Sequence, residues 1–177
     1  MESTHGKVPS SFQGDKLPVN DVSWDDCQKF INSCEVKGLK VKLPHEDEWE
    51  YACRGGLGNK RHFYWGDTLN NDSLNGDKAN CNGDYPFGTT SKGSFLDKTT
   101  VVGTYETKAK HPWGLCDMSG NVREWCENLS SKEGTDRVLR GGSYSDDAVL
   151  CRSASRSQAT PDFVFGLNGF RVCLTAE

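Results

Sequence analysis

Eight cysteines and four histidines are the side chains of this sequence best suited to metal or redox chemistry. No two cysteines form a C-x-x-C pair, which argues against zinc ribbons and thioredoxin-like redox motifs. The histidines are scattered without ligand spacing, and spacing alone supports neither a Ser-His-Asp triad nor a carboxylate pair. Buried free thiols and one or two disulfides both stay open, because an even cysteine count permits bridges without requiring them. The residues are His5, His45, His62, His111, Cys27, Cys34, Cys53, Cys81, Cys116, Cys126, Cys151 and Cys173.

Two helices and a few short strands must position these side chains. Apolar residues at helical spacing predict a helix over 24–34, with Ser23 as N-cap and Gly38 as stop. A second helix opens at Pro44 and ends at 54–56, after an alternating segment over 39–43. Strands are expected over 100–105, 137–140 and 170–174, whereas residues 57–100 are rich in Gly, Asn, Asp, Ser and Thr. The pattern predicts a loop-dominated α+β domain.

Length and charge exclude several classes of protein. The 177 residues suit one domain, and 10% aromatic residues supply bulk for a core. No apolar run approaches the length of about 18 residues that a membrane span needs, and residues 1–6 lack a basic and apolar signal region. The net charge of -4 argues against a nucleic-acid partner, since phosphate contacts need a basic face.

Five blocks in the same order resemble the formylglycine-generating enzyme (sulfatase-modifying factor) family. They cover residues 18–24, 43–56, 113–125, 137–144 and 169–172. The resemblance implies a C-type-lectin-like fold of the formylglycine-generating enzyme type. It places one such domain over 18–177, with residues 1–17 as an N-terminal extension or truncated start.

The oxidase members of that family carry a cysteine pair just after the Gly-Gly-Ser-Tyr block, and its thiolates bind copper(I). Here Asp146 stands at the place of the first cysteine, and Cys151 aligns poorly with the second. A single thiolate beside aspartates is a poor copper(I) site. We therefore expect a protein that is not an enzyme, with a copper-dependent formylglycine-generating oxidase as the alternative.

The C-terminal segment resembles a narrower group, the variable proteins of diversity-generating retroelements, especially those of Treponema. In them, errors at adenines randomise AAY codons, which cannot yield Lys, Glu, Gln, Met or Trp. Residues 141–174 contain no Lys, Glu, Met or Trp, and Gln158 alone would have to be fixed. The resemblance implies a diversified ligand-binding surface, whereas the alternative is an edge strand whose aromatics fill the core. The predicted variable residues are Tyr144, Asp146, Val149, Leu150, Ser155, Ser157, Ala159, Asp162, Phe163, Val164, Phe165 and Leu167.

A protein is the expected ligand of that surface, because a broad aromatic and polar face suits such an interface. The resemblance further implies display at the cell surface or outside the cell, and we favour a monomer. The arginines of the framework blocks, such as Arg140 and Arg171, are expected to fix loop carbonyls rather than ligands.

No cofactor is expected to be required, but the resemblance implies a structural calcium ion. The carbonyls of Ser119, Gly120 and Val122 would bind it together with the carboxylate of Glu124. The alternative is that Glu124 caps or salt-bridges a loop. A second, weaker calcium site would map to Asn80 and the carbonyl of Cys81.

Overall fold

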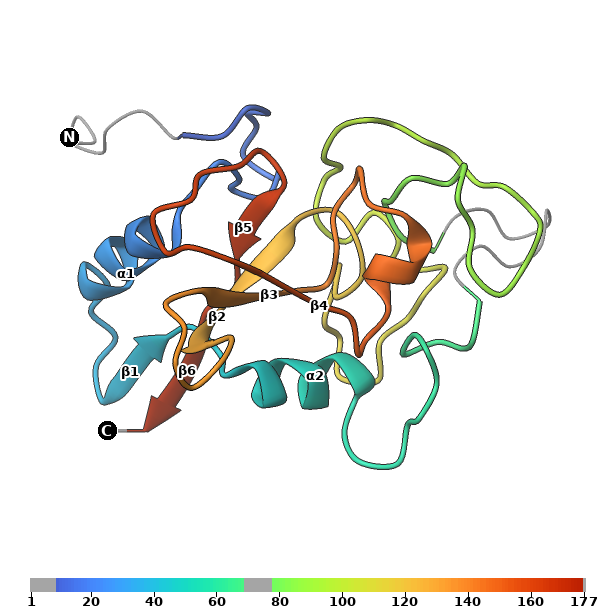
Figure 1. The fold of residues 1–177 in the computed structure, drawn as a ribbon. Coiled ribbons are helices and arrows are strands. Elements are labelled where there is room, and N and C mark those ends of the chain that lie inside the picture. The colour runs from blue at the N-terminus through green and yellow to red at the C-terminus, as the bar shows by residue number, and fades with distance from the viewer. Residues whose placement is uncertain (1–8, 69–77, 177) are drawn as a thin grey trace.

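Short elements on long loops make up the chain (Figure 1). The computed structural model describes residues 9–68 and 78–176. The predicted loop-rich α+β architecture is confirmed. The elements are α1 (Trp24–Asn32), β1 (Leu39–Lys42), α2 (Glu46–Arg54), β2 (Arg123–Leu129), β3 (Arg137–Arg140), the 3-10 turn η1 (Ala148–Cys151), β4 (Arg156–Ala159), β5 (Asn168–Phe170) and β6 (Cys173–Ala176).

The strands form two sheets. The larger has the order β4-β3-β2-β5, in which β5 runs parallel to β2 and the other pairs are antiparallel. The smaller joins β1 to β6, so that Leu39 lies opposite Ala176. Two segments that are far apart in the sequence therefore lie side by side.

Both predicted helices form, and local signals explain where they begin and end. Ser23 caps α1 in a reciprocal capping box with Asp26. His45 rather than Pro44 caps α2, and Gly55 ends this helix in the left-handed conformation, which glycine adopts without steric cost. Each helix buries one face in the core, through Cys27 of α1 and Cys53 of α2 among others.

Three tryptophan N–H groups fasten the helical layer to β2. The indole of Trp24 donates to the Cys126 carbonyl, and that of Trp125 donates to the Val22 carbonyl, both at 3.0 Å. Trp49 of α2 donates to Glu124 at 2.6 Å. Because Trp49 and Trp125 are almost fully buried, β2 is the central element of the core.

The prediction of a strand over 100–105 is wrong. This segment is a run of turns, with Val101 and Val102 exposed and the Val102 N–H bound to the Lys16 carbonyl. The single strand expected over 170–174 is instead two strands, because β5 pairs with β2 and β6 pairs with β1. The strand over 137–140 is confirmed as β3.

All eight cysteines carry free thiols, so the alternative of one or two disulfides is not realised in this structure. Arg140 donates to the carbonyls of Ser153, Ala154 and Ser155, which confirms its predicted role in fixing loop carbonyls. Within the described part of the chain, no helix is long and apolar enough to span a bilayer.

Candidate functional site

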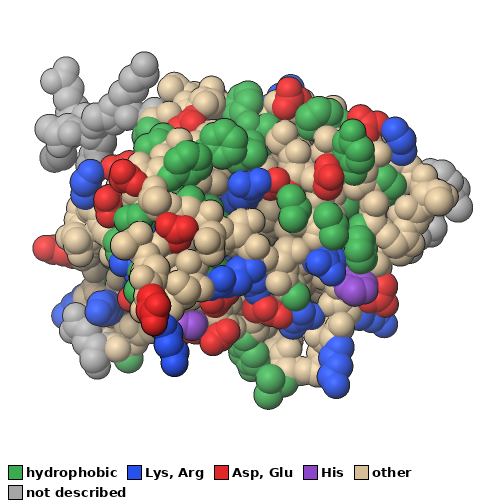
Figure 2. All heavy atoms as spheres, in the orientation of Figure 1, with side chains coloured by type: hydrophobic (Ala, Val, Ile, Leu, Met, Phe, Trp, Pro, Cys, Tyr) green, Lys and Arg blue, Asp and Glu red, His purple; other side chains and the backbone are tan. Residues whose placement is uncertain are grey.

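The predicted ligand-binding residues divide by exposure. Val149 and Leu150 on η1 are exposed, as is the run from Asp162 to Phe165 in the loop between β4 and β5. Figure 2 shows hydrophobic side chains gathered over this loop and over η1 on the same face of the molecule. The half-buried members are Ser155, Ser157, Ala159 and Leu167, and the buried members are Tyr144 and Asp146.

The loop between β4 and β5 presents an exposed aromatic pair. The rings of Phe163 and Phe165 lie 5.7 Å apart, and these side chains are 45% and 43% exposed. Val164 between them is 53% exposed. The alternative interpretation, an edge strand whose aromatics fill the core, does not describe this segment, because residues 162–165 contain no strand.

Hydrogen bonds hold this loop at both ends. The Asp25 N–H donates to the Pro161 carbonyl at 3.2 Å, and the Asn20 side-chain amide donates to the Gly166 carbonyl at 2.6 Å. The Arg123 N–H donates to the Leu167 carbonyl at 2.8 Å. The aromatic pair is thus carried by a fixed loop, so little conformational entropy remains to be lost when a ligand binds.

Tyr144 and Asp146 do not belong to an exposed surface, which corrects the prediction for both. Asp146 is buried because its carboxylate pairs with the Arg123 guanidinium and also accepts from the Ser143 N–H at 2.8 Å. Tyr144 is buried with its ring edge-on to Phe12, at 5.7 Å between centroids. Both residues stabilise the turn that precedes η1.

Cys151 does not form a copper(I) site with Asp146. Its side chain is fully buried, and contact with the Cys81 thiol together with burial raises the pKa of Cys151. Asp146 is already paired with Arg123. Copper(I) favours accessible thiolates, so these two residues do not fit the ion.

The predicted calcium ligand Glu124 does not fit calcium either. Both of its oxygens accept from Arg171, at 2.8 and 3.0 Å, and one also accepts from Trp49. Its charge is therefore already neutralised, whereas calcium binding relies on free carboxylate oxygens. Salt-bridging is the role that the structure gives Glu124.

The weaker calcium site, on Asn80 and the carbonyl of Cys81, stays a prediction. The Asn80 carbonyl accepts from the Asn121 N–H, while its side-chain amide donates to the Lys98 carbonyl. The Cys81 side chain packs in an apolar cluster. Across residues 9–68 and 78–176, no three acidic, histidine or cysteine side chains gather in a way that could hold a metal ion.

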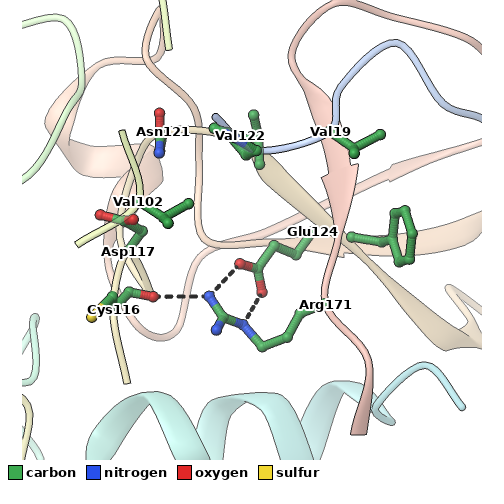
Figure 3. Close-up of a pocket in the computed structure, with 10 residues that line it drawn as sticks. Val19, Val102, Cys116, Asp117, Asn121, Val122, Glu124 and Arg171 are labelled. Carbon is green, nitrogen blue, oxygen red and sulfur yellow. Dashed lines mark hydrogen bonds and ion pairs between the residues drawn. The ribbon is translucent and has the colours of Figure 1, made fainter. Parts of the chain in front are cut away.

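An open cavity of about 410 Å³ lies beside the Glu124–Arg171 ion pair (Figure 3). Arg171 connects two segments that line the cavity. Its guanidinium donates to the Glu124 carboxylate at 2.8 Å and to the Cys116 carbonyl at 2.9 Å. In Figure 3, Asp117 and Val102 lie on one side of this ion pair and Val19 on the other. The lining residues are Pro18, Val19, Val102, Cys116, Asp117, Asn121, Val122, Glu124, Phe170 and Arg171.

Asp117 is the carboxylate of this cavity that sequence reasoning missed. It is half-buried in a left-handed backbone conformation (φ 56°) and accepts from the Gly103 N–H at 2.9 Å. Burial raises the pKa of Asp117. The cavity is lined by segments that are distant in sequence, so the sequence alone does not indicate that Asp117 lines it. The one local signal for Asp117 was its place in the 113–125 block.

The family described as "Sulfatase-modifying factor enzyme 1-like domain" matches residues 1–176. A "Formylglycine-generating enzyme" from Streptomyces coelicolor is 35% identical in an alignment 203 residues long that covers 100% of this chain and 60% of that protein. The protein of the same name from Mus musculus is 37% identical, over 87% of this chain and 43% of its own length. This chain thus spans about half the length of these relatives.

These relatives contradict the expectation that the chain is not an enzyme, since several at 31–37% identity carry the name of an enzyme. Another relative from Mus musculus, 34% identical over 91% of this chain and 50% of its own length, is named "Inactive C-alpha-formylglycine-generating enzyme 2". Among solved structures, "Treponema denticola variable protein 1" superposes with a TM-score of 0.70. It is 22% identical, over 94% of this chain and 77% of that one, so it shows the fold alone.

Proposed function

The chain belongs to the sulfatase-modifying factor family, and we propose that it binds a polypeptide through the loop between β4 and β5. The observation that carries the proposal is the exposed Phe163–Phe165 pair on a loop fixed at both ends. Exposed apolar groups of this kind mark interaction sites, and rigid aromatic anchors dominate binding energy at interfaces. Val149 and Leu150 on η1 extend the apolar character of the same face.

A random peptide library panned on the full chain tests this proposal. A selected peptide, once synthesised, is expected to bind wild type and to lose at least about tenfold in affinity when Phe163 and Phe165 are both replaced by Ala. The matched control is Tyr51→Ala with Trp113→Ala, which removes another exposed ring pair, 5.4 Å apart, on a different part of the chain. Equal affinity of wild type and the phenylalanine variant would refute the proposal.

We further propose that exposed positions of the 141–174 segment are the diversified ones. The absence of Lys, Glu, Met and Trp from this segment supports the idea, and the exposed run 162–165 is where substitutions disturb packing least. Sequencing of the genomic DNA near the 3′ end of the gene tests it. A near-copy of these codons, with adenines at the divergent positions and a reverse transcriptase gene nearby, is the expected finding. A unique segment without such a copy would count against diversification.

A second candidate function is the conversion of a peptide cysteine to formylglycine, which the names of the relatives support. Since Asp146 and Cys151 do not fit copper(I), this activity would have to use other residues. The same selected peptide, extended by a Cys-x-Pro-x-Arg segment, is incubated with the chain, copper and oxygen. An aldehyde detected with a hydrazide probe would establish the oxidase, whereas binding without an aldehyde would favour the binding function.

A further inference from the structure

Two carboxylates lie at the start of the loop between β4 and β5. Asp162 belongs to this loop and is exposed. Asp25, exposed on the first turn of α1, lies against the loop because its backbone N–H donates to the Pro161 carbonyl at 3.2 Å. Lys29 of the same helix pairs with Asp26 at 2.9 Å. Asp25 and Asp162 form no ion pair among residues 9–68 and 78–176.

A third carboxylate lies at the end of the loop. One oxygen of Asp21 is 3.3 Å from the position that a Cβ atom would occupy on Gly166. Asp21 is half-buried, and it accepts from the N–H and the hydroxyl of Ser11, which carry no charge. Within the described part of the chain, Asp21 too has no ion-pair partner. Negative charge therefore flanks the exposed Phe163–Phe165 pair on both sides.

An apolar loop between unpaired carboxylates discriminates among partners by charge. The exposed side chains of Phe163, Val164 and Phe165 offer contact to an apolar group. Figure 2 shows acidic side chains beside the hydrophobic ones over this loop and the neighbouring α1. Such a surface repels an acidic partner and attracts a basic one. An arginine guanidinium can also stack on a phenylalanine ring.

We propose that the polypeptide bound by this loop carries an apolar side chain with a lysine or arginine on each side of it. The inference rests on the proposed function and adds the chemistry of the partner. Six residues run from Pro161 to Gly166, so the two ends are at most about 18 Å apart. An extended partner crosses that distance in about six residues, which places its basic residues near the ends of a segment of that length.

The charge preference does not depend on the residues proposed to be diversified. Asp21 and Asp25 lie outside the 141–174 segment, and only Asp162 lies within it. A change of Phe163 or Phe165 would alter the shape of the apolar centre, whereas the two carboxylates outside the segment would stay. Partners of different variants would then share their basic residues and differ in the apolar one.

The panned peptide library separates this inference from the proposed function. Selected peptides are sorted by whether their affinity falls when Phe163 and Phe165 are both replaced by Ala. Among the dependent peptides, we expect at least about twice the share of Lys and Arg found in the unselected library. An equal or lower share would overturn the charge preference and leave polypeptide binding in place. If no selected peptide depends on the ring pair, the proposed function fails and this inference fails with it.

One dependent peptide is then synthesised in three forms, with its basic residues kept, replaced by Gln, or replaced by Glu. Fluorescence anisotropy of the labelled peptides with the full chain gives the affinities. The basic form is expected to bind at least about fivefold more tightly than the Gln form, and the Glu form more weakly still. That difference should shrink between about 50 mM and about 300 mM NaCl, because salt screens exposed charges. Equal affinities of the three forms would refute the inference.

The triple variant Asp21→Asn, Asp25→Asn and Asp162→Asn removes the three charges at nearly constant shape. Asparagine tolerates the left-handed backbone of residue 21 (φ 59°) and can still accept from Ser11. The variant is expected to lose at least about fivefold in affinity for the basic form and to bind the Gln form as wild type does. Unchanged binding of the Gln form also shows that the loop is intact.

The matched control is Asp47→Asn, which removes the charge of an exposed aspartate on the other helix, α2. It is expected to leave both affinities unchanged. Full affinity of the triple variant for the basic form, or an equal loss in Asp47→Asn, would refute the role of the three carboxylates.

Discussion

At the scale of single residues, two carboxylates that are close in sequence have opposite surroundings. Glu124 is buried and accepts from Arg171 and Trp49, whereas Asp117 lines a cavity without an ion-pair partner among the described residues. A paired buried charge is tolerated, but an unpaired one lowers the stability of the folded state. The ionised Asp117 side chain therefore lowers the stability of the folded state, and a cation beside it would restore part of that stability.

Replacing Asp117 by Asn is expected to stabilise the unliganded chain at neutral pH. Because burial raises the pKa of Asp117 above its unfolded value, ionisation costs the folded state stability. That cost grows as pH rises through the interval between the two pKa values, and it is absent below the unfolded value of about 3.9. Thermal unfolding of the wild type and the variant from pH 3 to pH 7 measures this cost. The Tm of the variant should exceed that of the wild type at pH 7, and the two Tm values should become equal at pH 3. A variant that is less stable at pH 7 would contradict the account.

At the scale of elements, local signals predicted what local interactions stabilise. The capping box of α1 and the terminal Gly55 of α2 are formed by adjacent residues, so both helices could be predicted. The turns over 100–105 could not be predicted in this way, because the Val102 N–H donates to the carbonyl of Lys16, which is distant in sequence. The same limit applies to the site. Tyr144 and Asp146 look available in the sequence, but both are buried, with Phe12 and Arg123, which are distant in sequence, among their contacts.

The inward faces of the elements also determine which thiols react. Cys27 of α1 and Cys53 of α2 are fully buried, and burial raises the pKa of each thiol to about 12. Few thiolates form there, so neither should react with maleimide until the chain unfolds. Native-state labelling followed by mass spectrometry should therefore modify the half-buried thiols first, namely Cys34, Cys116 and Cys173. Early modification of Cys27 or Cys53 would show that the helices open locally. Labelling in guanidinium chloride serves as the control, because all eight thiols should then react.

At the scale of the whole molecule, β2 connects the layers and the pairing of β1 with β6 joins distant parts of the chain. The indoles of Trp24, Trp49 and Trp125 all join β2 to the helical layer. The β1–β6 sheet is separate from the larger sheet and consists of two strands. A two-stranded sheet is marginal alone, so it depends on packing against the rest.

Removing β6, with a chain that stops at Val172, is expected to destabilise the fold. Val41 of β1 is buried and lies opposite Leu174, so deletion leaves β1 without its partner strand. A loss of about 3 kcal/mol in the free energy of unfolding is expected from the lost pairing and burial. Urea unfolding followed by circular dichroism measures it, with Thr175→Ala as the control that keeps the strand. An unchanged urea midpoint would show that β6 adds nothing to stability.

The pairing of β1 with β6 has a consequence for how the chain is made. Leu39 leaves the ribosome long before Ala176, its partner in the sheet, has been synthesised. Throughout that interval β1 has no partner strand, and β2 likewise waits for β5. Pairings of such long sequence separation form slowly and leave strand edges open meanwhile. The nascent chain should consequently be a substrate for chaperones until β6 emerges and pairs with β1.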